Sequence, residues 1–173
     1  ELPQLRSVDI GNIRKIKALL AIISTEVPML VDITKLATLT GIARTTMLAY
    51  LQYLHEAKLI RLLYSDDLSV KKMQKPDKIL MENTNLLQAL SLQVPNIGTM
   101  RETFFCNQLG YTHQVEYNKR GDYLIDHKYV FEIGGKAKDG KQVANMENAY
   151  IASDECDYPI GNKLPLWLFG LMY

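Results

Sequence analysis

The sequence has few cysteines and little net charge. Only two cysteines, Cys106 and Cys156, occur in 173 residues, far apart and with no CxxC pair. They provide neither a disulfide framework nor a cysteine pair typical of a zinc site, which favours a reducing compartment. The formal net charge is +1. With so small a net charge, the protein as a whole does not attract nucleic acid, so any basic patch that binds it must be local.

Long hydrophobic runs are absent as well. The longest apolar segment near the end, Leu164 to Tyr173, is interrupted by Pro165 and Gly170 and is about half as long as a membrane span. No charged-then-apolar secretion signal opens the sequence. We therefore expect a cytoplasmic protein without a membrane partner. The chain begins at Glu1 rather than at a methionine, and we expect it to be a piece of a longer polypeptide.

The composition is that of an ordinary globular protein, with 47% hydrophobic residues.

The first part of the sequence, residues 1–82, predicts a helical domain that ends in a strand pair. After a linker over residues 1–11 we expect three helices: from Asn12 as a cap to about Ser24, from Asp32 as a cap through Leu39, and from about Ala43 to Ala57. The third helix should bury Met47, Tyr50, Leu51 and Leu54. Strands at 59–64 and 78–81 flank a lysine-bearing loop.

Three helices followed by such a strand pair resemble a winged helix. The pattern GIARTTMLAYLQYLHEAKLIRLL is similar to the turn, recognition helix and first wing strand of that family. The resemblance implies DNA contacts, with side chains in the major groove and wing lysines on phosphate. The residues concerned are Arg44, Thr45, Ala49 and Gln52 on the helix, and Lys71, Lys72 and Lys75 in the wing. The recognition helix carries few cations, so docking to a protein remains the alternative.

Residues 83–173 predict an α/β or α+β domain. Asn83 is expected to cap a short helix through Ser91. A longer helix from Thr99 to Gly110 should begin with a capping box formed by Thr99 and Glu102. Strands are expected at 113–117, in a hairpin within 121–136, and at 149–152.

The hairpin GDYLIDHKYVFEIGGK is the most informative segment. A three-residue turn at 126–128 would place Asp122 directly across from Glu132. Opposed Cβ atoms lie about 5 Å apart, and two carboxylates that close repel each other unless a cation or a proton lies between them. This predicts a divalent-metal site. Two alternatives remain open: a two-residue turn would put the acids on opposite faces, and the acids could belong to a solvated polar face.

The order Glu102, Asp122, Glu132, Lys136 resembles the restriction-endonuclease-like superfamily, whose signature is PD-(D/E)xK. The resemblance implies that Asp122 and Glu132 hold Mg²⁺. It further implies that Lys136 orients or activates the attacking water and that Glu102 joins the site from its helix.

The sequence departs from this signature twice. Gly121 stands where the signature has proline, and Gly134 stands where it has lysine. Lys136 lies two residues further on, and a bulge at the glycine pair would let it reach back. Loss of nuclease activity is the alternative outcome of that displacement.

The chain as a whole resembles the C-terminal region of bacterial and archaeal AAA-type P-loop ATPases, where a winged helix precedes a restriction-endonuclease-like domain. The segments that carry the resemblance are KMQKPDKILMENTNLLQAL, PNIGTMRETFFCNQL, GDYLIDHKYVFEIGGK and GNKLPLWLFGLMY. The resemblance implies an ATPase module as a partner in the same polypeptide, because this chain has no G-x-x-x-x-G-K-[ST] motif.

Three hypotheses follow. The first is an interaction region of such an ATPase, whose winged helix can contact DNA and whose nuclease-like domain is degenerate. The second is an active Mg²⁺-dependent nuclease that uses Asp122, Glu132 and Lys136. The third is a winged-helix transcription regulator with sequence-selective DNA binding. No feature of the sequence sets the oligomeric state.

Overall fold

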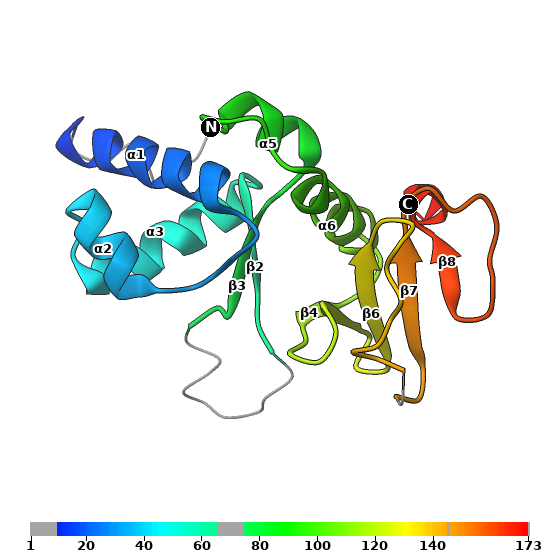
Figure 1. The fold of residues 1–173 in the computed structure, drawn as a ribbon. Coiled ribbons are helices and arrows are strands. Elements are labelled where there is room, and N and C mark those ends of the chain that lie inside the picture. The colour runs from blue at the N-terminus through cyan, green and yellow to red at the C-terminus, as the bar shows by residue number, and fades with distance from the viewer. Residues whose placement is uncertain (1–9, 66–74, 145, 173) are drawn as a thin grey trace. The chain divides into compact units, whose positions relative to one another are not determined.

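The computed structural model describes residues 10–65, 75–144 and 146–172. They form a mixed α+β protein with two β-sheets (Figure 1). Contacts divide the chain into two units. Unit 1 comprises Glu1–Leu62 and Lys78–Pro95, and unit 2 comprises Leu63–Asp77 and Asn96–Tyr173. The boundary predicted from the sequence falls after residue 82, whereas the short helix that follows it clusters with unit 1.

Unit 1 combines helices with a three-stranded sheet. Its helices are α1 (Ile10–Glu26), α2 (Ile33–Thr40), α3 (Arg44–Glu56) and α5 (Thr84–Leu90). The sheet has the order β1 (Met29–Leu30), β3 (Lys78–Met81), β2 (Ile60–Leu63), and β1 pairs antiparallel with β3.

Local signals explain where these helices begin and end. The Asp32 side chain accepts hydrogen bonds from the N–H groups of Thr34 and Lys35, as expected for a cap. Gly41 ends α2 at φ +64°, a left-handed conformation that glycine adopts without strain. The four residues predicted to be buried on α3 are buried, and Asn83 caps α5 as predicted. The Asn12 cap is wrong, because α1 already includes Ile10.

Unit 2 contains a five-stranded sheet in the order β4-β5-β6-β7-β8. Its strands are β4 (Val115–Tyr117), β5 (Tyr123–Ile125), β6 (Tyr129–Gly134), β7 (Ala149–Ser153) and β8 (Lys163–Pro165). The first three are antiparallel, and β7 and β8 continue the sheet in parallel. The strand predicted at 113–117 therefore forms only over its last three residues.

Side chains cover both faces of this sheet. Helix α6 (Ile97–Leu109) and the 3₁₀ helix η2 (Leu166–Leu171) bring Phe105 and Phe169 onto Phe131 and Tyr123, with Phe105 and Phe169 ring centroids 4.8 Å apart. On the other face, the apolar cluster consists of Leu124, Val130, Val143, Ala149 and Ile151. Such two-sided burial explains why β5 and β6 contain consecutive buried residues rather than a wet and a dry face.

Within residues 10–65, 75–144 and 146–172, none of the helices has the length and apolar character needed to cross a bilayer.

Candidate active site

The hairpin of β5 and β6 has the three-residue turn that its sequence predicts. Tyr123 pairs with Phe131 and Ile125 with Tyr129, which leaves residues 126–128 as the turn. Asp126 and His127 adopt the left-handed conformation there, at φ 51° and 54°. Aspartate tolerates this conformation better than most residues. The alternative of a two-residue turn, which would have separated the two acids, is therefore wrong.

Asp122 lies just beyond the last pair of this ladder. Its N–H donates to the Phe131 carbonyl at 2.8 Å, and its Oδ2 accepts from the Ile133 N–H at 2.6 Å. The carboxylate thus takes the place of a backbone partner. Because Phe131 and Ile133 flank Glu132 in β6, these two bonds hold Asp122 beside Glu132, although the regular pair expected between the two acids does not form.

Glu132 is buried, with 2% of its surface exposed. Its Oε1 lies 2.8 Å from Lys138 Nζ. Its Oε2 is buried too, and among the described residues it has no hydrogen-bond partner. An unsatisfied carboxylate oxygen inside a protein is costly. The solvated-face alternative is therefore wrong for Glu132, and this atom is the part of the site that a bound cation would satisfy.

The lysine that reaches this site is Lys138, two residues beyond the predicted Lys136. A Cβ built on Gly134 would lie 2.8 Å from Cβ and Cγ of Lys138. The Lys138 side chain therefore runs across Gly134, over the position where the signature has its own lysine. A turn brings it back, since the Lys138 N–H donates to the Gly135 carbonyl at 3.0 Å.

Three carboxylates act on the Lys138 ammonium. Partial burial lowers the pKa of Lys138, but the hydrogen bond to Glu132 and the Glu132 charge raise it. The charges of Asp122 and Glu102 add to this effect, and the net result is a raised pKa. Lys138 is therefore a cation at neutral pH. If all three carboxylates are ionised, the group carries a net charge of −2, which a divalent cation would balance.

Glu102 contributes from helix α6. The predicted capping box is wrong, because Asn96 caps this helix by accepting from the Thr99 N–H, and Thr99 lies inside the first turn. Glu102 Oε2 instead accepts a hydrogen bond from the Tyr123 hydroxyl at 2.5 Å. Burial raises the pKa of Tyr123 well above its ordinary value, and Cys106 and Glu102 raise it further. The phenol therefore stays protonated and fixes Glu102 next to β5.

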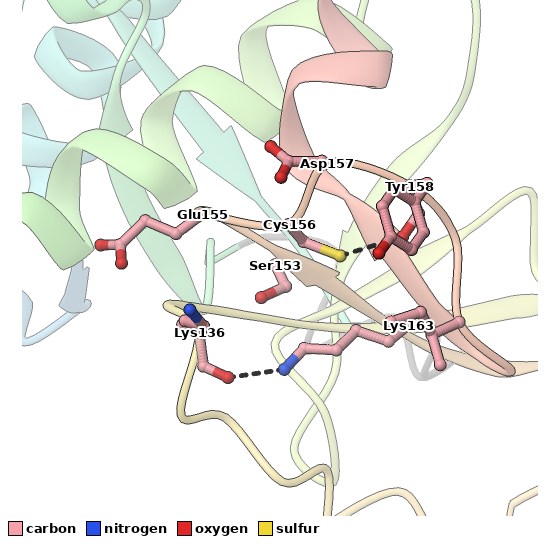
Figure 2. A pocket seen from close by; sticks show the side chains of 8 residues that line it. Lys136, Ser153, Glu155, Cys156, Asp157, Tyr158 and Lys163 are labelled. Carbon is pink, nitrogen blue, oxygen red and sulfur yellow. Dashed lines mark hydrogen bonds between the residues drawn. The ribbon is translucent and has the colours of Figure 1, made fainter.

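Lys136 has a different surrounding. It is exposed and lines a cavity of about 370 Å³ beside the carboxyl ends of β6 and β7 (Figure 2). The Lys136 carbonyl accepts a hydrogen bond from Lys163 Nζ at 2.7 Å. The remaining lining residues are Ser153, Glu155, Cys156, Asp157, Tyr158, Ile160 and Lys163.

These residues suit magnesium better than a metal that needs a full protein cage. Among the described residues, no three or more His, Cys, Asp or Glu side chains form a metal-binding group. Mg²⁺ commonly binds one or two carboxylates and completes its shell with water and substrate phosphate. Asp122 and Glu132 provide such a pair, and the unsatisfied Glu132 Oε2 is a carboxylate oxygen of the kind that coordinates Mg²⁺.

The residues predicted to contact DNA lie mainly on α3. Arg44, Thr45 and Gln52 are exposed. Positions 45 and 52 are two helical turns apart, so these side chains share one face. The Arg44 guanidinium donates to Thr34 Oγ1, and Gln52 Nε2 donates to Glu56 Oε1 at 3.1 Å. Lys75 is exposed, whereas Lys71 and Lys72 lie outside the described residues.

Sequence reasoning missed Lys138 and Tyr123. Strict alternation along the hairpin puts Tyr123 on one apolar face with Ile125 and Phe131, and it does not indicate that the Tyr123 hydroxyl meets Glu102. The glycine pair at 134–135 was the available signal for Lys138, because a missing side chain makes room for another. None of the protein-family models, curated proteins and solved structures compared with this chain matches it.

Proposed function

We propose that unit 2 is a Mg²⁺-dependent nuclease and that unit 1 is a winged helix that contacts DNA. The observation that carries the proposal is the contact between Lys138 and Glu132. The signature lysine is missing at position 134, and its absence favoured a degenerate site. Lys138 provides an ammonium group at that place instead. In this arrangement an acid pair and a helix acid all act on one lysine, which is the set of groups that the PD-(D/E)xK resemblance implies.

Each side chain then has a distinct role. Asp122 and Glu132 would hold the metal, with Glu132 contributing Oε2. When bound, Mg²⁺ acts as a Lewis acid and increases the acidity of a coordinated water. Lys138 is held as a cation at 2.8 Å from Glu132 Oε1, where it can orient the attacking water or donate to a phosphate oxygen. Tyr123 keeps Glu102 in place.

The element order of unit 1 supports the winged-helix part of the proposal. Helix, short strand, two helices and two further strands follow one another, and the sheet order is β1-β3-β2. Exposed Arg44, Thr45 and Gln52 on α3 are available to the major groove. An ATPase module in the same polypeptide remains our expectation for the partner.

The decisive experiment compares two lysines. The purified chain is incubated with double- and single-stranded DNA and Mg²⁺, and cleavage rates are measured for Lys138→Met and Lys136→Met. We expect Lys138→Met to lose about 100-fold or more in rate, as Asp122→Asn and Glu132→Gln should. Lys136→Met, the matched control, should retain the wild-type rate. The reverse result for the two lysines would restore the assignment made from sequence.

A second candidate is an interaction region with an inactive nuclease-like domain. It is favoured by the fact that the Lys138 ammonium already neutralises Glu132, so the lysine can replace the metal. In that case Mg²⁺ leaves the thermal stability unchanged, and no DNA is cleaved. For a metal site, Mg²⁺ should raise the melting temperature of the wild type and not that of Glu132→Gln.

A further inference from the structure

We propose that Lys163 is a positioning residue that holds the loop at residues 135–138, so that Lys138 reaches Glu132. Lys163 lies on β8, far from the hairpin in sequence. The expected effect of Lys163 on cleavage rests on the proposed nuclease function. The effect of Lys163 on the position of Lys138 does not, and it can be measured without any activity.

The contacts that carry the inference are two hydrogen bonds to the loop backbone. Lys163 Nζ donates to the Lys136 carbonyl at 2.7 Å and to the Lys138 carbonyl at 3.2 Å. Figure 2 shows the first of these bonds as a dashed line between Lys163 and Lys136. An ammonium that bridges two carbonyls makes charge-assisted bonds, which are stronger than those between neutral groups.

Lys163 itself is held firmly. Its backbone exchanges two hydrogen bonds with Ile160, each 2.9 Å long, and it pairs with Ile151 of β7. The side chain therefore starts from a fixed strand. Ser153 Oγ, at the end of β7, shares its proton between the Gly135 carbonyl at 3.2 Å and the Asp154 carbonyl at 3.1 Å. Ser153 ties the base of the loop, and Lys163 ties the part that carries Lys138.

The geometry of Lys138 depends on that tie. Its Cβ and Cγ lie close above Gly134, and its Nζ ends at Glu132. Both contacts require the Lys138 backbone to stay near β6. Releasing the Lys138 carbonyl would let the loop move outward, and the ammonium would leave the carboxylate.

The test uses Lys163→Met, Lys163→Arg and, as a control, Lys141→Met. Lys141 is an exposed lysine that pairs with Asp139 at 2.6 Å and makes no part of the proposed tie. The first measurement is the rate at which sulfo-NHS acetate acylates Lys138, followed by mass spectrometry. We expect faster acylation in Lys163→Met, and near wild-type rates in Lys163→Arg and Lys141→Met. Unchanged acylation in Lys163→Met would overturn the inference, even if the wild type cleaves no DNA.

The second measurement is kinetic. Lys163→Met should lower kcat about tenfold, which corresponds to the loss of a charge-assisted bond, and leave KM unchanged. In Gly134→Lys/Lys138→Gly the lysine is carried by the strand and no longer needs the loop. Lys163→Met should then have no further effect on kcat. An equal loss in both backgrounds would mean general structural damage and would overturn the inference. If Lys163→Met does not fold, Lys163→Gln takes its place in both measurements.

Discussion

Tyr123 connects the aromatic core of unit 2 with the acidic residues. It is fully buried, its ring stacks near Phe105, and its hydroxyl donates to Glu102. One side chain therefore couples packing to the orientation of a helix carboxylate. A buried donor to a charged acceptor contributes more than an exposed one.

Replacing this phenol should have a measurable cost. Tyr123→Phe keeps the ring and removes the donor to Glu102, so we expect a loss of about 1–3 kcal/mol in the free energy of unfolding. Urea denaturation followed by circular dichroism measures it. Tyr158→Phe is the matched control, because Tyr158 is exposed and should change little. Equal stability of the two variants would mean that the bond to Glu102 contributes nothing net.

The hairpin turn carries a pH-dependent contact. The hydrogen bond from His113 lowers the pKa of Asp126, and the Gln114 N–H lowers it further. Because the folded pKa lies below the ordinary value of 3.8, the ionised form stabilises the fold. That contribution is present above pH 3.8 and is lost as the pH falls through the lower folded pKa.

Asp126→Asn should therefore be less stable than the wild type at neutral pH. The difference should close as the pH falls below the folded pKa of Asp126. Urea titrations of both proteins across this range measure it. Asparagine tolerates the positive φ of this position, so the variant adds no backbone strain. A stability gap that stays constant with pH would show that the Asp126 charge is not its source.

At the scale of the elements, Gly134 decides which lysine the site uses. An alanine there would place its Cβ 2.8 Å from two carbons of Lys138. These carbons lie near the Lys138 backbone and cannot swing aside like the end of a flexible chain. We expect Gly134→Ala to lower kcat about tenfold or more by displacing Lys138, with KM unchanged.

Cleavage kinetics on the full chain measure the kcat of Gly134→Ala. Gly41→Ala is a control for replacing a glycine, because open space surrounds Gly41, although its φ of +64° adds some strain. The control should lose stability without losing kcat in the folded fraction. If both variants retain wild-type kcat, the close approach of Lys138 to Gly134 has no catalytic importance.

Alternation along the hairpin predicted which side chains share a face for a three-residue turn, but it left a two-residue turn open, and only the observed register excludes that turn. Apolar side chains at every second position fix the phase of a strand, and a slip by one residue would invert both faces. The same reasoning could not find Lys138. Its position depends on a loop whose path is determined by Lys163, from a strand 25 residues later. Periodicity carries no information about such a contact.

The capping signals in the sequence predicted some helix starts correctly and others wrongly. Asp32 and Asn83 each precede a helix and cap it. Thr99 and Glu102 have the spacing of a capping box, but Asn96 lies three residues earlier and captures the Thr99 N–H. Two competing caps cannot be ranked from spacing alone. As a result, the Glu102 carboxylate faces Tyr123 instead of its own helix end.

At the scale of the whole molecule, we propose that unit 1 binds DNA and that unit 2 carries out the chemistry. The net charge is only +1, so DNA affinity must come from local groups. The exposed face of α3 offers one cation, Arg44, beside Thr45 and Gln52. Few phosphate contacts produce a shallow dependence of affinity on salt. We therefore expect α3 to contribute little to the salt dependence of DNA binding.

Substitutions in the two units should then affect different constants. We expect Arg44→Ala to weaken DNA binding several-fold without changing kcat, whereas Lys138→Met should lower kcat without changing affinity. Fluorescence anisotropy without Mg²⁺ measures affinity, and cleavage with Mg²⁺ measures kcat.

Lys15→Ala removes a charge from the exposed side of α1 and controls for net charge. Arg44→Lys keeps the charge but loses the planar donor fork, so it separates phosphate attraction from directed hydrogen bonding. If Arg44→Ala and Lys15→Ala bind DNA equally well, α3 does not read DNA, and its exposed face is better explained as a docking surface for protein.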